Sequence, residues 1–240
     1  FLSFPQIREQ LMSFESFIIP YLSTDSSELF VNAALTSLFG YNFKNREIAE
    51  RLTKLASMKC YIHNIIIIIS QLADSSLQFF NDDIIIELCN HIKNDDVYLS
   101  FICINHLLLV GIEFPSQSIK SLLSVYELFI DPTPLHAVLS QIFSASRECK
   151  MSALKNGFLS LARKELVMFG ENRSRYKSIW RTVSCFIQDF REGQIGLLDL
   201  WTIDTLIEFF DTSDTMLNFY ICYANNNEIT QSSFCGPLLD

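Results

Sequence analysis

The feature that most constrains this chain is a run of five isoleucines, Ile65 to Ile69, inside the segment CYIHNIIIIISQL. Five consecutive residues point in every direction around a helix, so a helix that carries them must be covered on nearly all sides. A strand inside a parallel sheet could also hold such a run. No glycine or proline bounds the run, and its apolar character continues to Leu72. We therefore expect a buried helix, which packing must hold because isoleucine is only a modest helix former.

Helix signals recur along the rest of the chain. Glycine follows three apolar segments, LFVNAALTSLFG, INHLLLVG and LARKELVMFG, and glycine just past an apolar stretch is a common helix terminator. Seven glycines and six prolines in 240 residues are too few for a sandwich or barrel. The pattern predicts an all-α protein with helices near residues 4–20, 25–39, 44–57, 60–73, 82–92, 95–109, 117–129, 134–148, 151–169, 173–191, 195–210 and 213–223.

A weak internal repeat indicates how these helices are arranged. The segments LFGYNF (38–43) and LVGIEF (109–114) share a pattern and lie 71 residues apart, which equals two units of about 35. Predicted helix pairs start near 44, 82, 117 and 151 with the same period. We therefore expect antiparallel helix pairs stacked into an α-solenoid, whose covered middle layer suits the isoleucine run. A compact helical bundle is the alternative. A single repeat domain is expected over 1–223, followed by an extended tail over 224–240.

This arrangement resembles the irregular helical repeats of the armadillo and HEAT type. The resemblance is architectural, covers most of the chain, and brings no functional residue with it. It implies a scaffold for protein–protein interaction. The seven cysteines lie mostly among apolar neighbours, which favours reduced thiols in an intracellular protein. The chain starts at Phe1 without a targeting leader, so we expect a fragment of a larger intracellular protein, in the cytoplasm or nucleus.

A search for chemistry finds no catalytic pattern. The one close glycine pair, Gly193 and Gly196, lacks the lysine of a phosphate-binding loop. Three histidines lie near cysteines, but the spacings (Cys60 to His63, Cys89 to His91, Cys103 to His106) match no zinc module, and core thiols beside helix-end histidines explain them. His136 is assigned a role near a helix start, and the acid pairs at 82–83 and 95–96 are assigned to helix capping. We expect no enzyme, no metal and no cofactor.

Charge is distributed unevenly and suggests a binding region. Residues 147–191 hold ten of the eighteen Lys and Arg residues and four acids, whereas 192–240 hold eight acids and no Lys or Arg. Within this basic block, Arg173, Lys177 and Arg181 fall on one helix face beside Tyr176 and Trp180. The predicted partner-binding residues are Arg173, Arg175, Tyr176, Lys177, Trp180 and Arg181.

Three interpretations of this stripe stay open. It could be a solvated face with Trp180 in the core, a docking site for an acidic peptide or helix of another protein, or a phosphate-binding surface for nucleic acid. The acidic C-terminal stretch could also fold back onto it. In the tail, Phe234, Leu238 and Leu239 are the expected anchors. No membrane partner is expected, because the longest apolar run is far shorter than the about 20 residues that span a bilayer.

Overall fold

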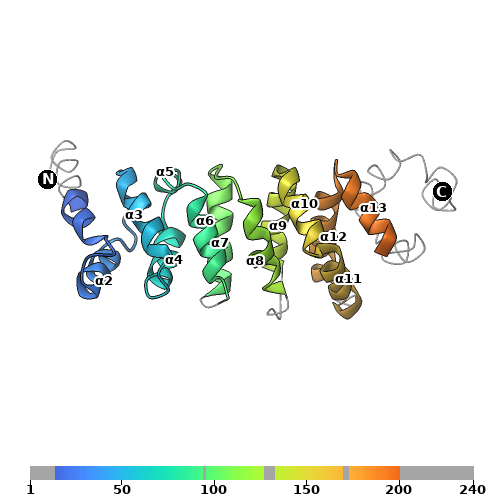
Figure 1. Ribbon diagram of the computed structural model, residues 1–240, viewed down its shortest axis with the longest axis horizontal. Helices are drawn as coiled ribbons and strands as arrows, with labels where there is room; N and C mark the ends of the chain where they lie inside the picture. Colours follow the sequence, from blue (N-terminus) through green and yellow to red (C-terminus); the bar gives the residue numbers. More distant parts are fainter. Residues whose placement is uncertain (1–13, 94–95, 127–132, 170–172, 201–240) are drawn as a thin grey trace. The chain divides into compact units, whose positions relative to one another are not determined.

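The computed structural model describes residues 14–93, 96–126, 133–169 and 173–200, and every regular element in these ranges is a helix. The chain divides into two compact units, residues 1–121 and 122–240. Figure 1 labels the helices of both units. Each unit is described by itself. The predicted helix at 213–223, most of that at 195–210, and the tail with Phe234, Leu238 and Leu239 lie outside the described residues, as does the start of the predicted 4–20 helix. No helix in the described ranges is both long enough and apolar enough to cross a membrane.

The first unit contains the helices that carry the repeat. Residues 14–18 are helical and continue into a short 3₁₀ turn, η1 (Ile19–Tyr21). The following elements are α2 (Glu28–Ser37), α3 (Arg46–Ala56), α4 (Ile62–Gln71), α5 (Asp74–Leu77), α6 (Asp83–His91), α7 (Val97–Leu109) and η2 (Ser116–Ser118). Helix α8 (Ile119–Leu123) crosses the boundary between the units. Only the short α5 has no counterpart in the predicted set.

Two layers of helices make up this unit. Helices α2, α4 and α7 pack side by side in one layer, and α3 and α6 pack against each other in a second layer beneath them. The first layer begins at residues 28, 62 and 97, so its helices start 34 and 35 residues apart. This spacing confirms the predicted period of about 35 residues.

Helix α4 lies in the middle of this arrangement, with α2 and α7 on its flanks and α3 and α6 beneath it. Four of the five isoleucines, Ile65, Ile66, Ile68 and Ile69, are almost fully buried, and Ile67 is partly exposed. The thiol of Cys103 on α7 donates to the carbonyl of Ile66 at 3.3 Å. The prediction of a buried helix is therefore confirmed, and Ile67 marks the side of α4 that none of the described helices of this unit covers.

Three buried phenylalanines mark successive repeats. Phe43 lies three residues before α3, Phe80 three residues before α6, and Phe114 two residues before η2. The rings of Phe43 and Phe80 meet edge to face with centroids 6.1 Å apart. Gly40 and Gly111 precede two of these residues and have positive φ angles of 69° and 91°, which few other residues adopt without strain. The predicted glycine terminators at these positions are confirmed; Gly170 lies outside the described residues.

The second unit contains α9 (Thr133–Ala145), α10 (Arg147–Lys155), α11 (Phe158–Phe169), α12 (Arg173–Ile187) and α13 (Arg191–Leu200). The prediction of one helix over 151–169 is wrong. Helix α10 begins earlier, where the hydroxyl of Ser146 accepts from the backbone N–H of Cys149, and it ends before Gly157. Gly157 has a φ of 77°, outside the helical region, so α11 starts afresh with a new direction.

Aromatic side chains fill the interior of this unit. The rings of Phe143, Phe158 and Phe186 lie with centroids 5.0 to 5.1 Å apart, and Phe190 contacts Phe186 at 5.4 Å. Gly193 lies against this cluster, because a methyl group there would come within 2.5 Å of Phe190 Cδ1. Gly193 and Gly196 both lie inside α13. The glycine pair therefore allows close helix packing.

Candidate protein-binding surfaces

Helices α2, α4 and α7 of the first unit have exposed apolar residues. Leu29 on α2 is 76% exposed, and Ile102 and Leu109 on α7 are 46% and 67% exposed. These helices of 10, 10 and 13 residues contain a single Asp, Glu, Lys or Arg between them, Glu28. We call the exposed residues of these three helices the row face. Because the second layer covers the opposite side, the row face points away from α3 and α6.

On α7 the exposed residues form a stripe at helical spacing. Tyr98, Ile102 and Leu109 recur at intervals of four and seven residues and are all substantially exposed. The buried side of the same helix consists of Phe101, Cys103, Ile104 and Leu107 with Ser100. The helix is thus apolar on both sides, although only one side belongs to the core. An apolar stripe that the fold leaves uncovered is typical of an interaction surface.

Polar groups lie between the apolar residues of the row face. The side-chain amide of Asn64 on α4 donates to Oδ1 of Asn32 on α2 at 3.4 Å, so these two side chains connect neighbouring helices. Asn64 and Ile67 lie three residues apart on the exposed side of α4. The row face therefore combines apolar contact area with uncharged hydrogen-bonding groups.

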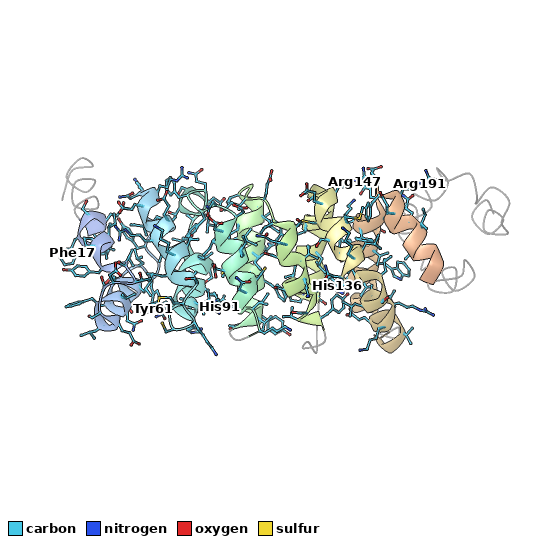
Figure 2. All side chains as sticks on the ribbon, viewed as in Figure 1. Phe17, Tyr61, His91, His136, Arg147 and Arg191 are labelled. Carbon is cyan, nitrogen blue, oxygen red and sulfur yellow. The ribbon has the colours of Figure 1, made fainter. Side chains whose placement is uncertain are left out.

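Exposed aromatic rings surround the start of α2. The ring of Phe17, labelled in Figure 2, lies 5.6 Å from that of Tyr21, which lies 5.5 Å from the ring of Phe30 on α2. Phe17 and Phe30 are both more than half exposed. Aromatic rings supply large contact areas at low entropic cost, so this cluster extends the apolar surface at one end of α2.

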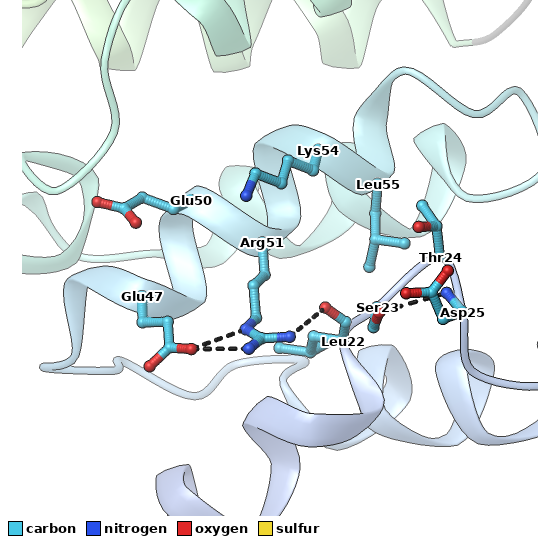
Figure 3. Close-up of a pocket in the computed structure, with 9 residues that line it drawn as sticks. All are labelled: Leu22, Ser23, Thr24, Asp25, Glu47, Glu50, Arg51, Lys54 and Leu55. Carbon is cyan, nitrogen blue, oxygen red and sulfur yellow. Dashed lines mark hydrogen bonds and ion pairs between the residues drawn. The ribbon is translucent and has the colours of Figure 1, made fainter.

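The second layer of the first unit has different chemistry. Helix α3 has five charged residues in 11, and a polar pocket of about 310 Å³ lies between it and residues 22–25 (Figure 3). Arg51 donates to one carboxylate oxygen of Glu47 through Nε and Nη2 at 3.0 and 2.8 Å, and to the carbonyl of Leu22 at 3.4 Å. Arg51 thereby ties the loop to α3.

The remaining charged groups of the pocket have mixed signs. Figure 3 shows Lys54 and Glu50 on the α3 wall, and Thr24 and Asp25 on the loop opposite. Glu50 pairs with Arg46 at 3.1 Å in an exposed ion pair. Exposed pairs of this kind contribute little to stability. With both signs present and apolar atoms supplied mainly by buried Leu22 and Leu55, the pocket suits a polar group of balanced charge.

In the second unit, the structure separates two neighbouring members of the predicted stripe. Trp180 is 3% exposed and belongs to the core, whereas Arg181 is exposed. Trp180 is therefore not accessible to a partner in this state, in agreement with the interpretation that placed it inside. Arg173, Arg175, Tyr176 and Lys177 lie in the first part of α12, and their side chains are outside the described part of the structure.

A buried polar cluster centred on His136, which is labelled in Figure 2, joins three helices of this unit. Nε2 of His136 on α9 lies 3.0 Å from Oε2 of Glu165 on α11 and 3.0 Å from the hydroxyl of Tyr126. Nδ1 lies 3.2 Å from Oγ1 of Thr182 on α12, which lies 2.9 Å from the hydroxyl of Ser140. His136 lies in the first turn of α9, near a helix start as expected, but it is a core residue that links α9 to α11 and α12.

The order hydroxyl, imidazole, carboxylate also occurs in hydrolase triads, but here the hydroxyl is engaged elsewhere. Oγ1 of Thr182 contacts the backbone carbonyls of His136 and Ser178, each at 3.1 Å. Thr182 itself is fully buried, so a substrate has no route to its hydroxyl. Burial, together with the charge of Glu165 and a hydrogen bond to it, raises the pKa of Tyr126 well above its usual 10. The cluster is a packed network within the unit.

Sequence reasoning missed Glu165, although a signal was present. Phe158, Leu159, Ala162 and Leu166 define the buried side of α11, and Glu165 falls on that same side. Its Oε1 has no hydrogen-bond partner among the described residues. A carboxylate at an apolar helix position requires a buried partner, and that partner is His136.

The cysteines near histidines and the paired aspartates at 82–83 and 95–96 were the other candidates for chemistry. Cys89 and Cys103 are buried, Cys60 is exposed, and in the described ranges no group of three or more His, Cys, Asp or Glu residues is placed to hold a metal ion. Asp96 caps α7 by accepting from the backbone N–H of Leu99 at 3.0 Å, as predicted. Asp82 precedes α6 without a capping side-chain bond, so its predicted capping role is not confirmed; Asp95 is not described.

Comparison with known proteins supports the fold. No protein-family model matches the chain, and no curated protein matches it. Among solved structures, the chain is similar to a designed armadillo repeat protein in complex with the peptide (KR)4, at 12% sequence identity and a TM-score of 0.58. The match covers 86% of this chain and 97% of the designed protein. The fold is therefore a helical-repeat solenoid of the armadillo type, as the sequence predicted.

Proposed function

We propose that this protein is a non-catalytic scaffold that binds other proteins through the row face of its first unit. The observation that carries the proposal is the exposed apolar stripe on α7 beside an already complete core. Ile102 and Leu109 are exposed although Phe101, Cys103 and Ile104 fill the interior. Covering exposed apolar surface removes it from water and lowers the free energy, so continuous apolar patches mark interaction sites.

The chemistry of the row face indicates its occupant. With Glu28 as its single charged residue, the face offers no partner for a strongly charged ligand. Burying an unpaired charge against it would be costly. The occupant proposed is therefore an uncharged, largely apolar segment of another protein, with Asn32 and Asn64 available to its backbone or polar side chains.

The designed armadillo repeat protein supports the use of such a repeat surface for peptides, since it is in complex with one. Its peptide, (KR)4, is strongly basic, whereas the row face has a single charged residue, Glu28. We infer from this likeness that the repeat surface binds a peptide segment, and from the residues of this chain that the segment is uncharged. It also retains an intracellular setting within a larger protein complex, which the free, buried thiols of Cys89 and Cys103 support.

The test is affinity capture from cell extract with three forms of the chain. One form carries Ile102→Glu and Leu109→Glu in the row face. The matched control carries Val167→Glu and Ile195→Glu, which change two exposed apolar residues of the second unit in the same way. We expect a set of proteins that the wild type and the control capture and the row-face variant does not. Identical capture by all three forms would contradict the proposal.

A further inference from the structure

The pocket between α3 and residues 22–25, which we call the α3 pocket, contains two unpaired charges of opposite sign. Lys54 extends from α3, and Asp25 belongs to the loop opposite (Figure 3). Among the described residues, neither the ammonium of Lys54 nor the carboxylate of Asp25 has an ion-pair or hydrogen-bond partner. The other charged lining residues are held in ion pairs along α3: Glu47, Glu50 and Arg51. The pocket therefore offers a cation on one wall and an anion on the other.

Apolar side chains line the same pocket, and its walls are fixed to each other. Leu22 of the loop and Leu55 of α3 are at most 1% exposed, so both are anchored in the core. Arg51 donates to the carbonyl of Leu22 at 3.4 Å, which ties the loop to α3. Within the loop, the backbone N–H of Asp25 donates to Oγ of Ser23 at 3.2 Å. These contacts form the pocket without any contribution from a ligand.

We propose that the α3 pocket binds a small zwitterion with an aliphatic body, the chemistry shared by a free amino acid and a dipeptide. The carboxylate of the ligand accepts from Lys54, and its ammonium donates to Asp25. Its aliphatic part lies against Leu22 and Leu55. A ligand with only one charge would leave Lys54 or Asp25 without a partner, so a zwitterion is favoured.

The size of the pocket agrees with this class of ligand. Its volume is about 310 Å³, at the lower end of the range of about 300 to 1,000 Å³ that is typical of small-molecule sites. A metabolite of this size fits, whereas a folded segment of a partner protein does not. The α3 pocket lies in the second layer, so this proposal goes beyond the row face and does not depend on it.

Isothermal titration calorimetry with the full chain tests the proposal. The zwitterionic probes are L-leucine and the dipeptide leucylglycine. Two analogues each lack one charge: N-acetyl-L-leucine has no ammonium, and L-leucinamide has no carboxylate. The test variants are Lys54→Gln and Asp25→Asn. The matched controls, Lys59→Gln and Asp74→Asn, change two exposed residues outside the pocket in the same way. Far-ultraviolet circular dichroism checks that each variant is folded.

We expect one of the two zwitterions to bind the wild type and both controls alike, and each test variant about tenfold or more weakly. The tighter of the two identifies the source of the ligand as a free amino acid or a dipeptide. Both analogues should bind more weakly than L-leucine. Asp25→Asn should not weaken N-acetyl-L-leucine further, and Lys54→Gln should not weaken L-leucinamide further, because each analogue already lacks the group that the replaced side chain contacts. A merely structural role of Lys54 or Asp25 would not produce this selectivity.

Absence of binding by both zwitterions at millimolar concentration would overturn the proposal. Equal losses in the test and control variants would overturn it as well, as would analogues that bind as tightly as L-leucine, because binding would then not depend on the two charges. The row-face variant, Ile102→Glu with Leu109→Glu, should bind the zwitterion like the wild type. The two proposals can therefore fail separately.

Discussion

The imidazole Nε2 of His136 lies 3.0 Å from Oε2 of Glu165, and both side chains are at most 3% exposed. His136 lies on α9, and Glu165 lies on α11, 29 residues later in the chain. Their contact therefore connects these two helices. Removing one member of a buried pair leaves the other without its partner, and that loss costs more than the pair itself contributes.

Glu165→Ala should therefore lower the free energy of unfolding by about 3 kcal/mol or more. The same substitution at Glu148, an exposed residue in the first turn of α10, should cost less than about 1 kcal/mol. Urea denaturation followed by circular dichroism measures both. Equal effects at the two positions would show that the Glu165 carboxylate is solvated rather than buried against His136.

Two adjacent residues of α12 give opposite predictions. Trp180→Ala should destabilise the second unit by about 3 kcal/mol or more, because a buried indole leaves a large cavity. Arg181→Ala should change the free energy of unfolding by less than about 0.5 kcal/mol, because the side chain is exposed. Thermal and urea unfolding of the two variants provide the comparison. An unchanged free energy of unfolding in Trp180→Ala would show that the indole is exposed and available to a partner.

Thiol reactivity should follow burial. Burial raises the pKa of both Cys89 and Cys103 from the usual 9 to about 12, and only the thiolate is strongly nucleophilic. Cys60 is exposed and should react first among these three with N-ethylmaleimide at neutral pH. Peptide mass spectrometry identifies the labelled positions. Labelling of Cys89 or Cys103 as fast as Cys60 would contradict the packing of α6 and α7.

Stability should fall in alkaline solution. Burial first, then the hydrogen bond to Glu15 and its negative charge, raise the pKa of Tyr41 from 10 to about 12. The folded chain therefore keeps a proton on Tyr41 that the unfolded chain releases. This difference adds to the free energy of unfolding; the contribution is complete below pH 10 and is lost as the pH rises toward 12. Cys89 and Cys103 act in the same direction from pH 9. The melting temperature should decrease through this range, and less steeply in Tyr41→Phe; equal slopes would exclude a contribution from Tyr41.

Replacing Gly193 with a larger residue should destabilise the second unit. A methyl group there would lie 2.5 Å from Phe190 Cδ1 and 2.9 Å from Phe186 Cε1, so Gly193→Ala should cost about 1 to 3 kcal/mol through overpacking. Gly196 has looser surroundings, with its nearest neighbour at 3.2 Å, and Gly196→Ala should cost less. Urea denaturation of the two variants compares the positions. The reverse order would show that the ring cluster can rearrange.

Much of the fold was predictable because local signals and packing agree. Glycines 40 and 111 end helices as expected, and the isoleucine run is buried because helices flank it on three sides. The break at Gly157 was missed, since the residues before and after it both favour helix. Phe80 was also missed as a repeat marker, because no glycine precedes it as Gly40 precedes Phe43.

The candidate site was less predictable, for a physical reason. Helix α7 is apolar on every side, so its sequence does not distinguish the buried Phe101 from the exposed Ile102. The positions of α4, α5 and α6 decide which side is covered. Likewise, charge spacing placed Trp180 beside a basic stripe, but the packing of α9 and α11 against α12 determines that the indole is internal.

Site-specific photocrosslinking tests the central claim most directly. A benzoylphenylalanine is placed at Ile102 in the row face or, as the control, at Glu50 on the exposed side of α3. Irradiation in cells should yield a covalent adduct with another protein from the Ile102 position and none from Glu50. Adducts from Glu50 alone, or equally from both positions, would contradict the assignment of protein binding to α2, α4 and α7.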